Sequence, residues 1–342
     1  MLKVDSGGID VGARELMVVL RRDGQRQAPR SFPNTPEGHR AICRYLAKAG
    51  HLVRVCLEST GLYGLDLAVA LSACDGIQVM VANPRAVRRF AEAMGNRSKN
   101  DRIDAALLEE FAARMPFRPW QPPSKIALEL RAIARRIKAL TAACTAEKNR
   151  LHAALSSQST PRIVRRDLQD SIRHHQQSTL RLRKEALRVI AQDQRLKGQF
   201  DLLVTTPGIA STSAILILGE IAVLSEDLDA RQWVAHAGLD PRHESSGTSV
   251  NKPGHISKAG NKYLRSALYM PALVARRWQP NLRAFALHLV AKGKKPIQAL
   301  IAVMRKLLVA IYNMLRRNQA FDGSTLYWLP DGPLATATPE AA

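Results

Sequence analysis

The N-terminal part of the chain, up to about Met115, alternates short apolar runs with amphipathic stretches, which predicts strands and helices in turn. Three strands are expected first, with the turn pair Asp23-Gly24 between the second and the third. Capping residues then mark helix starts at Thr35-Pro36 and Asn83-Pro84. The expected strands are Leu2–Ile9, Glu15–Arg21, Gln27–Phe32, Leu52–Leu57 and Ile77–Val81, and the expected helices are Pro36–Gly50, Tyr63–Cys74, one from Pro84 and Asp101–Met115. This order is that of the ribonuclease-H fold, a mixed α/β fold.

The middle of the chain has a different period. From Ile126 to Leu155 apolar residues recur at spacings of 4, 3, 4, 3, 4, 7 and 4, the a/d seam of a coiled coil. A break at Ser156–Pro161 precedes a second, weaker helical pattern over Ile163–Gln192, so a hairpin of two long helices is expected. Such an arm is either a solvated spacer or a device for dimerisation or for gripping nucleic acid, and both roles are compatible.

The C-terminal part is predicted to be mostly helical. Residues 202–221 indicate two helices joined by a Pro-Gly turn, and Glu244–Gly260 is expected to be a polar loop. Two further helices are expected over Asn261–Trp278 and Pro296–Leu315, and the tail after Pro330 has a low-complexity composition. The expected domains are residues 1–120 with the α/β fold, 121–198 as the coiled-coil arm, 199–325 as a helical domain and 326–342 as a disordered tail.

The net charge and its distribution along the chain indicate which class of partner the protein binds. The chain has 342 residues and a formal net charge of +22, while its 46% hydrophobic content excludes a disordered basic tail. Residues 242–317 carry 15 basic residues and one acid, whereas residues 1–120 are nearly balanced, with 18 basic and 13 acidic residues. A surface of this kind favours a polyanion, first of all nucleic acid.

Other features indicate a soluble cytoplasmic protein. Asp5 and Asp10 interrupt any apolar leader, and Arg305 and Lys306 interrupt the most apolar C-terminal stretch, so neither a signal peptide nor a membrane span is expected. The four cysteines have no metal-ligand spacing and are typical of buried thiols in a reducing compartment. No phosphate loop, zinc-finger spacing or aromatic platform for base stacking is found, so ATP use and structural zinc are not expected.

Four acids are candidates for metal chemistry. Asp10 and Glu58 each lie at the end of an expected strand, and Asp101 and Asp104 share one face of a helix start. In a ribonuclease-H fold these positions converge, and clustered carboxylate oxygens suit Mg²⁺, which can assist phosphodiester cleavage. Each acid taken alone is also typical of a turn or of a helix cap.

Two C-terminal motifs are candidates for nucleic-acid chemistry. The Glu244–Gly260 loop is rich in serines among cations, and it is either a plain flexible loop or the carrier of a nucleophile, although no histidine is arranged obviously as its base. The turn Thr206-Pro207-Gly208-Ile209 resembles a helix-hairpin-helix whose backbone amides face a phosphate, and it is also compatible with a tight turn between packed helices.

The order of motifs resembles a known family. GIDVGA, PRAVRRFAEAMGNRSKNDRIDA, TTPGIASTSA, AGLDPRHESSGTSV, ISKAGNKYLRSALYMPA and the Lys294-Lys295 helix follow one another over nearly the whole chain. Together they resemble the transposases of the insertion-sequence one-ten family, DEDD recombinases described as bridge-RNA-guided. The chain departs from the family pattern at Ala13, where Lys is frequent, and at Ala210, which replaces a glycine of the hairpin.

The resemblance implies specific roles. The N-terminal domain of the chain would be similar to the RuvC-like branch of the ribonuclease-H fold, with Asp10, Glu58, Asp101 and Asp104 holding Mg²⁺. The serine before a glycine in PRHESSG would place the nucleophile at Ser246, with Ser245 and Ser249 as alternatives. The reaction would be serine attack on DNA, a phosphoserine intermediate and strand exchange, which conserves bond energy and needs no ATP.

The resemblance also implies partners. A bridge RNA would pair with donor and target DNA, and dimers supported by the coiled coil would assemble into a tetramer that combines the acids of one subunit with the serine of another. The setting would be the bacterial cytoplasm at the nucleoid. The expected nucleic-acid contacts are Arg85, Arg88, Arg89, Gly208, Arg242, Lys252, Lys258, Lys262, Arg265, Lys294 and Lys295. Two other functions stay open: a metal-dependent nuclease for branched DNA without a serine nucleophile, and a non-catalytic nucleic-acid scaffold.

Overall fold

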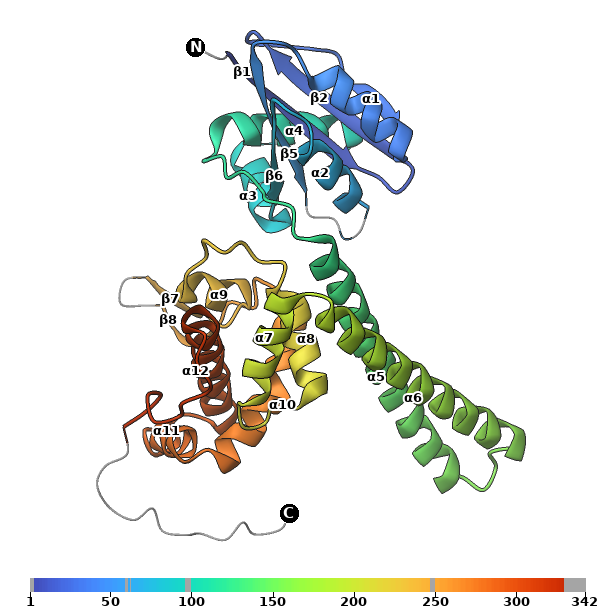
Figure 1. The fold of residues 1–342 in the computed structure, drawn as a ribbon, viewed down its shortest axis with the longest axis vertical. Helices are drawn as coiled ribbons and strands as arrows, with labels where there is room; N and C mark the ends of the chain where they lie inside the picture. The colour runs from blue at the N-terminus through green and yellow to red at the C-terminus, as the bar shows by residue number, and fades with distance from the viewer. Residues whose placement is uncertain (1–2, 59–60, 62, 96–99, 247–249, 329–342) are drawn as a thin grey trace. The chain divides into compact units, whose positions relative to one another are not determined.

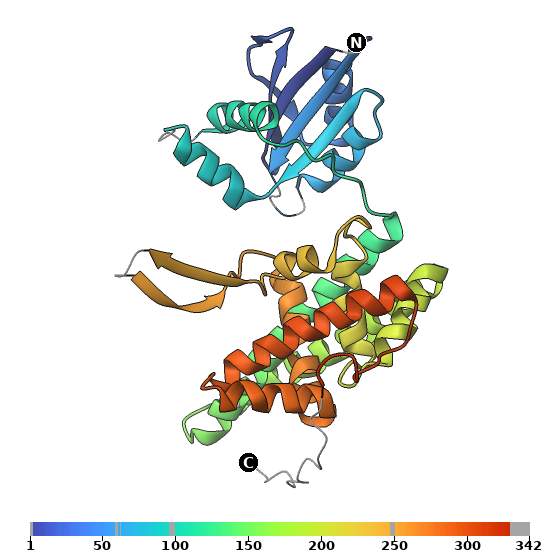
Figure 2. The ribbon, with the colours of Figure 1, turned by 90° about the vertical axis from the view of Figure 1, so that its left-hand side faces the viewer.

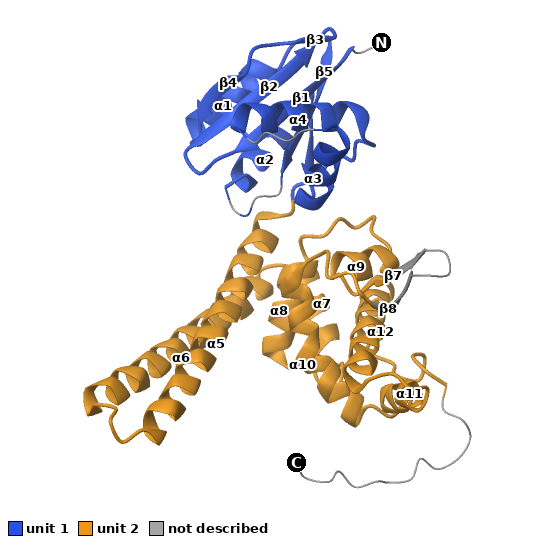
Figure 3. Cartoon of the chain, turned by 180° about the vertical axis from the view of Figure 1, so that it is seen from behind, with its two compact units in different colours: residues 1–122 blue, residues 123–342 orange. Residues whose placement is uncertain are grey.

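The computed structural model describes residues 3–58, 61, 63–95, 100–246 and 250–328, and within 243–254 it describes the backbone alone. The chain forms two compact units, Met1–Pro122 and Pro123–Ala342 (Figure 3). The larger sheet lies in the first unit, and the second unit is mostly helical. The protein therefore combines a mixed α/β part with a helical part, which confirms the expected fold class at that level.

The sheet of the first unit has the strand order β3-β2-β1-β5-β6, and β4 also pairs with β2. Strand β1 runs antiparallel to β2 and parallel to β5, which is parallel to β6 (Figure 1). The strands are β1 (Lys3–Val11), β2 (Glu15–Arg22), β3 (Gln25–Arg26), β4 (Arg30–Pro33), β5 (His51–Glu58) and β6 (Ile77–Ala82). The single third strand expected over Gln27–Phe32 is wrong: β3 and β4 replace it, separated by a stretch that includes Pro29, which has no N–H for a ladder.

Helices cover both faces of this sheet, and the period-2 alternation of the strands decides which side chains meet them. One face packs Val53, Val55 and Leu57 of β5 under α1 and α2, whereas the other packs Cys56 under α3 and α4. Figure 2 shows this sheet between its helices. The helices are α1 (Pro36–Leu46), α2 (Leu65–Ser72), α3 (Pro84–Ala93) and α4 (Asp101–Arg114).

The second unit is built on one helical core. Its elements are α5 (Lys125–Ser156), α6 (Arg162–Ala191), α7 (Gln194–Val204), α8 (Ser211–Ile221), α9 (Ala230–His236), β7 (Pro241–Ser246), β8 (Val250–Ile256), α10 (Lys262–Trp278), α11 (Pro280–Ala291) and α12 (Pro296–Arg317). The predicted long hairpin of α5 and α6 is present. Of its seam, Leu130, Ile137, Leu140 and Cys144 are buried and Ile126 and Ile133 are partly buried, while Leu155 near the tip is exposed.

The base of this arm belongs to the same core as the C-terminal helices. Leu130, Ala134 and Ile137 of α5 are buried together with Ala214, Ile215 and Leu218 of α8. A Cβ at Gly219 would lie 2.7 Å from the Cβ of Ala134, so only glycine allows this approach of α8 to α5. The arm and the C-terminal helices, expected as separate domains meeting at residue 198, therefore share one compact unit.

The polar loop expected over Glu244–Gly260 is wrong for most of its length. Strand β7 pairs antiparallel with β8, with Pro241 opposite Ile256 and Ser246 opposite Val250. Figure 2 shows this hairpin extending from the helices of its unit. Ladder hydrogen bonds between two polar strands leave no apolar alternation in the sequence, and for that reason composition indicated a loop. Helices α9 and α11 were also not expected.

Helix α12 is long and apolar enough by length and composition to span a membrane, but half of its most apolar window is buried inside the unit. Its buried side chains, among them Val303, Leu307 and Ile311, belong to the helical core. Packing therefore accounts for its apolar character. The tail expected to be disordered from residue 326 lies outside the described residues from residue 329 onward.

Candidate functional site

The first two acids lie side by side on neighbouring parallel strands. Ile9 of β1 pairs with Leu57 of β5, so Asp10 and Glu58 follow at the same level of the two strands. Ile9 and Leu57 are buried under α1 and α2, and successive side chains of a strand point to opposite faces. Asp10 and Glu58 therefore lie on the face that α4 covers, as the sequence predicted for the ends of these strands.

Helix α4 supplies the other two acids from its first turn. Asn100 caps the helix by accepting a hydrogen bond from the N–H of Ile103 at 2.8 Å, so Asp101 and Asp104 stand at its start. The helix crosses β1 at Gly8, where a Cβ would lie 2.1 Å from the carbonyl oxygen of Ala105. The backbones of β1 and α4 meet directly because residue 8 has no side chain.

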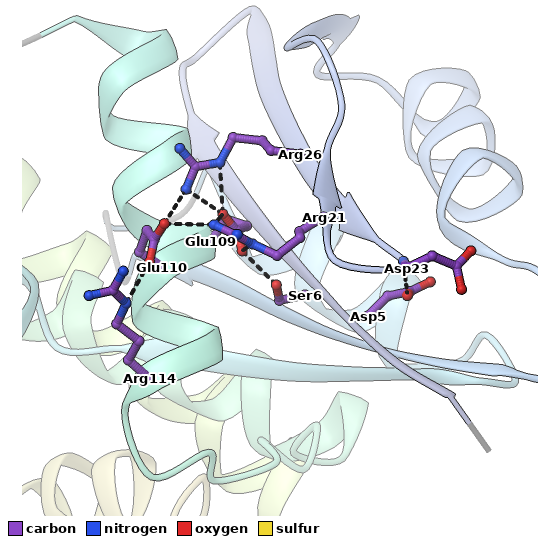
Figure 4. Close-up of polar contacts among 8 residues, drawn as sticks. All are labelled: Asp5, Ser6, Arg21, Asp23, Arg26, Glu109, Glu110 and Arg114. Atoms are coloured by element: carbon purple, nitrogen blue, oxygen red, sulfur yellow. Dashed lines mark hydrogen bonds and ion pairs between the residues drawn. The ribbon is translucent and has the colours of Figure 1, made fainter. Parts of the chain in front are cut away.

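A buried polar cluster holds α4 in this register. Glu109 is completely buried and accepts a hydrogen bond from Ser6 Oγ at 2.6 Å. Arg21 Nε donates to Glu109 at 2.7 Å, and Arg26 Nη2 donates to it at the same distance (Figure 4). Both arginines also bind Glu110, so β1, β2 and the strand β3 are tied to one turn of α4.

Sequence reasoning missed this cluster, although a signal for it exists. Ala105, Leu108 and Ala112 form the buried stripe of α4, and Glu109 falls on the same stripe, one turn after Ala105. A glutamate at a buried position requires charged or hydrogen-bonding partners, and the two arginines of the neighbouring strands provide them.

The other three acids lie near enough to Asp10 for their charges to act on it. Burial raises the pKa of Asp10 to about 6, and the negative charges of Asp104, Asp101 and Glu58 contribute to the rise, while the N–H of Val11 partly offsets it. Among the described residues, no three His, Cys, Asp or Glu side chains approach closely enough to hold one metal ion together. The structure thus brings the acids to one end of the sheet, but their side chains are not arranged around a single metal position.

The serine candidates lie at the far end of the β7–β8 hairpin. Ser245 and Ser246 belong to β7 by backbone, and the side chains of both, like that of Lys252, are outside the described residues. Ser249 lies outside them entirely. The register places Ser246 opposite Val250, directly before the segment that joins the strands.

The expected nucleic-acid contacts have different surroundings. Most of the described ones are exposed, and Arg88 also pairs with Glu92 on α3. Arg265 is different, because its Nη1 donates to the carbonyl oxygen of Ala237 at 2.8 Å and is committed to the protein. The exposed ones are Arg85, Arg88, Arg89, Arg242, Lys258, Lys262, Lys294 and Lys295.

Packing accounts for Gly208 in the proposed helix-hairpin-helix turn. Its φ is +88°, and a Cβ there would lie 2.6 Å from the carbonyl oxygen of Pro271 in α10. The next helix starts without a side-chain cap at Ala210. The tight-turn interpretation therefore explains this glycine by itself, independently of any phosphate contact.

Comparison with known proteins places both units in one family. A transposase model of the IS110 DEDD type matches residues 7–159, and a model described as the transposase IS116/IS110/IS902 family matches residues 200–287. The N-terminal match includes all four acids, and the C-terminal match includes the hairpin.

Individual proteins that are similar to this chain support the two family matches. The pilin gene-inverting protein of Moraxella bovis is 32% identical over 298 residues, covering 85% of this chain and 90% of that protein. A 43.6 kDa protein of the insertion element IS110 of Streptomyces coelicolor is 22% identical over 86% of this chain and 89% of its own length. A solved RuvC of T. thermophilus with a Holliday junction matches over 34% of this chain and 98% of its own, at 15% identity and with a TM-score of 0.26. By the long match at 32% identity and the two family models, the chain belongs to the IS110 family of transposases.

Proposed function

We propose that this transposase is an RNA-guided serine recombinase that cuts and rejoins DNA through a phosphoserine at Ser246, with Asp10, Glu58, Asp101 and Asp104 as a Mg²⁺ site. The observation that carries the proposal is the grouping of Asp10 with three further acids where β1, β5 and the start of α4 meet. The sheet order, with β1 antiparallel to β2 and parallel to β5, supports a RuvC-like ribonuclease-H fold for the first unit.

The four acids fit a divalent cation by the chemistry of their donors. Carboxylate oxygens are the ligands that Mg²⁺ prefers, and acids that raise the pKa of Asp10 form a place where positive charge is favourable. The family and its DEDD acids imply dependence on a divalent metal, and Mg²⁺ is the ion that we propose. When bound, such an ion neutralises charge that develops at a scissile phosphate.

Ser246 is the proposed nucleophile. Its Oγ would attack phosphorus and lose its proton, while the P–O bond to one deoxyribose oxygen breaks and that oxygen takes up a proton. The reverse reaction, with a sugar hydroxyl of another strand, would rejoin DNA, so the phosphodiester energy is kept in the phosphoserine. The position of Ser246 near the end of an extended hairpin, in a region of strong positive charge, supports this role.

The partners follow from the same proposal. DNA is the substrate that the transposase family implies, and we propose that a bridge RNA pairs with donor and target DNA in the bacterial cytoplasm. Base pairing would select the sequence and the protein would grip backbones, which agrees with the absence of any base-reading motif in the sequence. Dimers joined through the arm, assembling into tetramers, would combine acids and serine from different subunits.

A covalent adduct tests the proposal. The purified protein is incubated with Mg²⁺, DNA of the element ends and RNA transcribed from the adjacent non-coding region, and then denatured and analysed for protein-linked DNA. The wild type is expected to form the adduct, and Ser246→Ala is expected to lose it. Ser245→Ala and Ser249→Ala serve as matched controls, each removing one neighbouring hydroxyl.

The outcomes separate the alternatives. Asp10→Asn is expected to abolish both nicking and the adduct. If Ser246→Ala still nicks DNA while Asp10→Asn does not, the protein is a metal-dependent nuclease and the serine mechanism is wrong. If DNA binds tightly but yields no product with any variant, the scaffold interpretation replaces both.

A further inference from the structure

We propose that Arg135, Glu220 and Asn261 form a positioning cluster that fixes the direction in which the β7–β8 hairpin leaves the helical unit and couples it to the arm helix α5. The inference rests on the proposed function only in one respect, that the hairpin carries the reacting serine. All three residues lie in the second unit, in α5, in α8 and at the start of α10.

Glu220 is the centre of the cluster. Its side chain is only 2% exposed, and it receives two hydrogen bonds from Arg135, with Nε to Oε1 at 2.7 Å and Nη2 to Oε2 at 2.8 Å. Asn261 Nδ2 donates to the same Oε2 at 2.7 Å. The ring of Tyr263 lies 4.5 Å from the Arg135 guanidinium and covers it. A carboxylate this deeply buried requires all of these partners, so helix α5 and residue 261 are held at fixed places around it.

Asn261 uses every polar atom of its side chain. Its Oδ1 accepts from the N–H groups of Tyr263 and Leu264 and caps α10. Its Nδ2 donates to Glu220 and lies 3.3 Å from His236 Nε2, and its backbone N–H donates to the carbonyl oxygen of His236 at 2.6 Å. Asn261 therefore joins the buried carboxylate to the end of α9, from which the chain enters the hairpin.

The two ends of the hairpin are clamped beside Asn261. The N–H of Lys258 donates to the carbonyl oxygen of Gly238. The N–H of Ser257 donates to the carbonyl oxygen of Asp240 at 2.9 Å. Ser257 Oγ also donates to the Asp240 carboxylate at 2.6 Å. A Cβ at Gly260 would lie 2.2 Å from the carbonyl oxygen of His236, so the chain returning from β8 passes against the end of α9. A shift of Asn261 must therefore move the base of both strands.

The cluster could act merely as a helix cap, and one substitution separates the two roles. Asn261→Asp keeps an oxygen that can cap α10, since Asp and Asn are equally good N-caps. It replaces the amide donor by a second carboxylate facing Glu220. Adding Glu220→Gln partly reverses the pair, because the glutamine amide can donate to the introduced carboxylate and its oxygen can still accept from Arg135 Nε, while the hydrogen bond from Arg135 Nη2 is lost. Asp193→Asn, an exchange of carboxylate for amide at the N-cap of α7, is the matched control.

Hydrogen exchange of the complete protein gives the first readout. In Asn261→Asp, the amides of Ser257, Lys258 and Asn261 are expected to exchange about ten- to a hundred-fold faster, the loss of one hydrogen bond to a charged group. Amides in the middle of α12 are expected to change little. The double variant Glu220→Gln/Asn261→Asp is expected to recover part of the protection, because one of the two hydrogen bonds from Arg135 remains, and Asp193→Asn is expected to behave as wild type.

Adduct formation on DNA gives the second readout. Asn261→Asp is expected to lower the rate at saturating DNA about ten-fold or more without weakening DNA binding, and the double variant is expected to restore part of it. The proposal is overturned if hairpin protection is unchanged in Asn261→Asp, if protection falls equally throughout the unit, or if the double variant recovers nothing. If the wild type forms no adduct at Ser246, only the proposed function is refuted. The hydrogen-exchange measurement needs no DNA, so it still tests whether Asn261 holds the base of the hairpin.

Discussion

Gly8 shows how one missing side chain can organise a site. Helix α4 lies directly on the backbone of β1 at this residue, two positions before Asp10. Neighbouring Gly7 has a different environment, because a Cβ there would make an ordinary contact of 3.4 Å with Val55. The two glycines are neighbours in the sequence, but a side chain at position 8 would collide with α4, whereas a methyl group at position 7 would fit.

Gly8→Ala is expected to destabilise the first unit by about 1–3 kcal/mol, the usual cost of overpacking, and to displace α4 with its two acids. Denaturant unfolding measures the first effect, and Mg²⁺-dependent nicking measures the second. Gly7→Ala is the control and is expected to retain both properties. Equal stability of the two variants would contradict direct backbone contact at Gly8.

Glu109 gives a pH-dependent prediction. Although burial opposes it, hydrogen bonds from Arg21, Ser6 and Arg26 hold the pKa of Glu109 below its ordinary value of 4.5. A carboxyl whose pKa is lowered by folding adds stability above its unfolded pKa, and that stability is lost as the pH falls through the folded value.

Glu109→Gln is therefore expected to lower the free energy of unfolding by about 1.5–3 kcal/mol at pH 7, and the difference from wild type is expected to shrink below pH 4.5. Urea unfolding across this pH range measures it. Glu37→Gln, which removes an exposed ion pair with Arg40 in the same unit, is expected to have a much smaller effect. A difference that is constant between pH 3 and pH 7 would show that ionisation of Glu109 is not responsible.

At the scale of elements, the arm leaves part of its apolar seam uncovered. Near the tip of the α5–α6 hairpin, Leu155 is 57% exposed and Ile163 is 71% exposed, whereas the seam near the base is buried. Exposed apolar residues at the end of a helical hairpin favour contact with another copy. This supports the proposal that the arm joins subunits.

Ile163→Glu is expected to shift the protein toward smaller species, measured by sedimentation at several concentrations, because it places a charge in the proposed contact. Gln169→Glu adds the same charge at an exposed position of the same helix and is expected to leave the assembly unchanged. If both variants assemble as the wild type does, the tip of the arm is not the contact between subunits.

At the scale of the whole molecule, the net charge of +22 gives a prediction about salt. If about 6–10 phosphates are contacted, DNA affinity is expected to fall by about 10³–10⁵ between about 50 and 200 mM salt. Replacing Lys294 and Lys295 by Gln is expected to flatten the dependence of log affinity on log salt by about two. Equilibrium binding at several salt concentrations measures both, and a nearly flat dependence in the wild type would contradict a backbone-gripping surface.

Local patterns carried much of the prediction. Alternation located β1, β5 and β6, the heptad seam predicted α5, and helix-start residues located α1, α3 and α4, since each signal depends on neighbours in the chain. The sequence pattern does not predict the hairpin β7–β8, because pairing between polar strands leaves no periodic signal. Glu109 and Glu220 were also missed, since their partners Arg21 and Arg135 are 88 and 85 residues away in sequence.

By itself the sequence determined the family, through the order of its motifs, and the identity of the four candidate acids, through their places at the ends of predicted elements. The tertiary structure decided what holds them, namely the contact of α4 with Gly8 and the burial of Glu109 between two arginines. Within the second unit it decided, through Gly219, that the arm and the C-terminal helices share one core. Motifs are read along the chain, whereas these contacts depend on packing distances of a few ångströms between distant segments, and local periodicity carries no information about them.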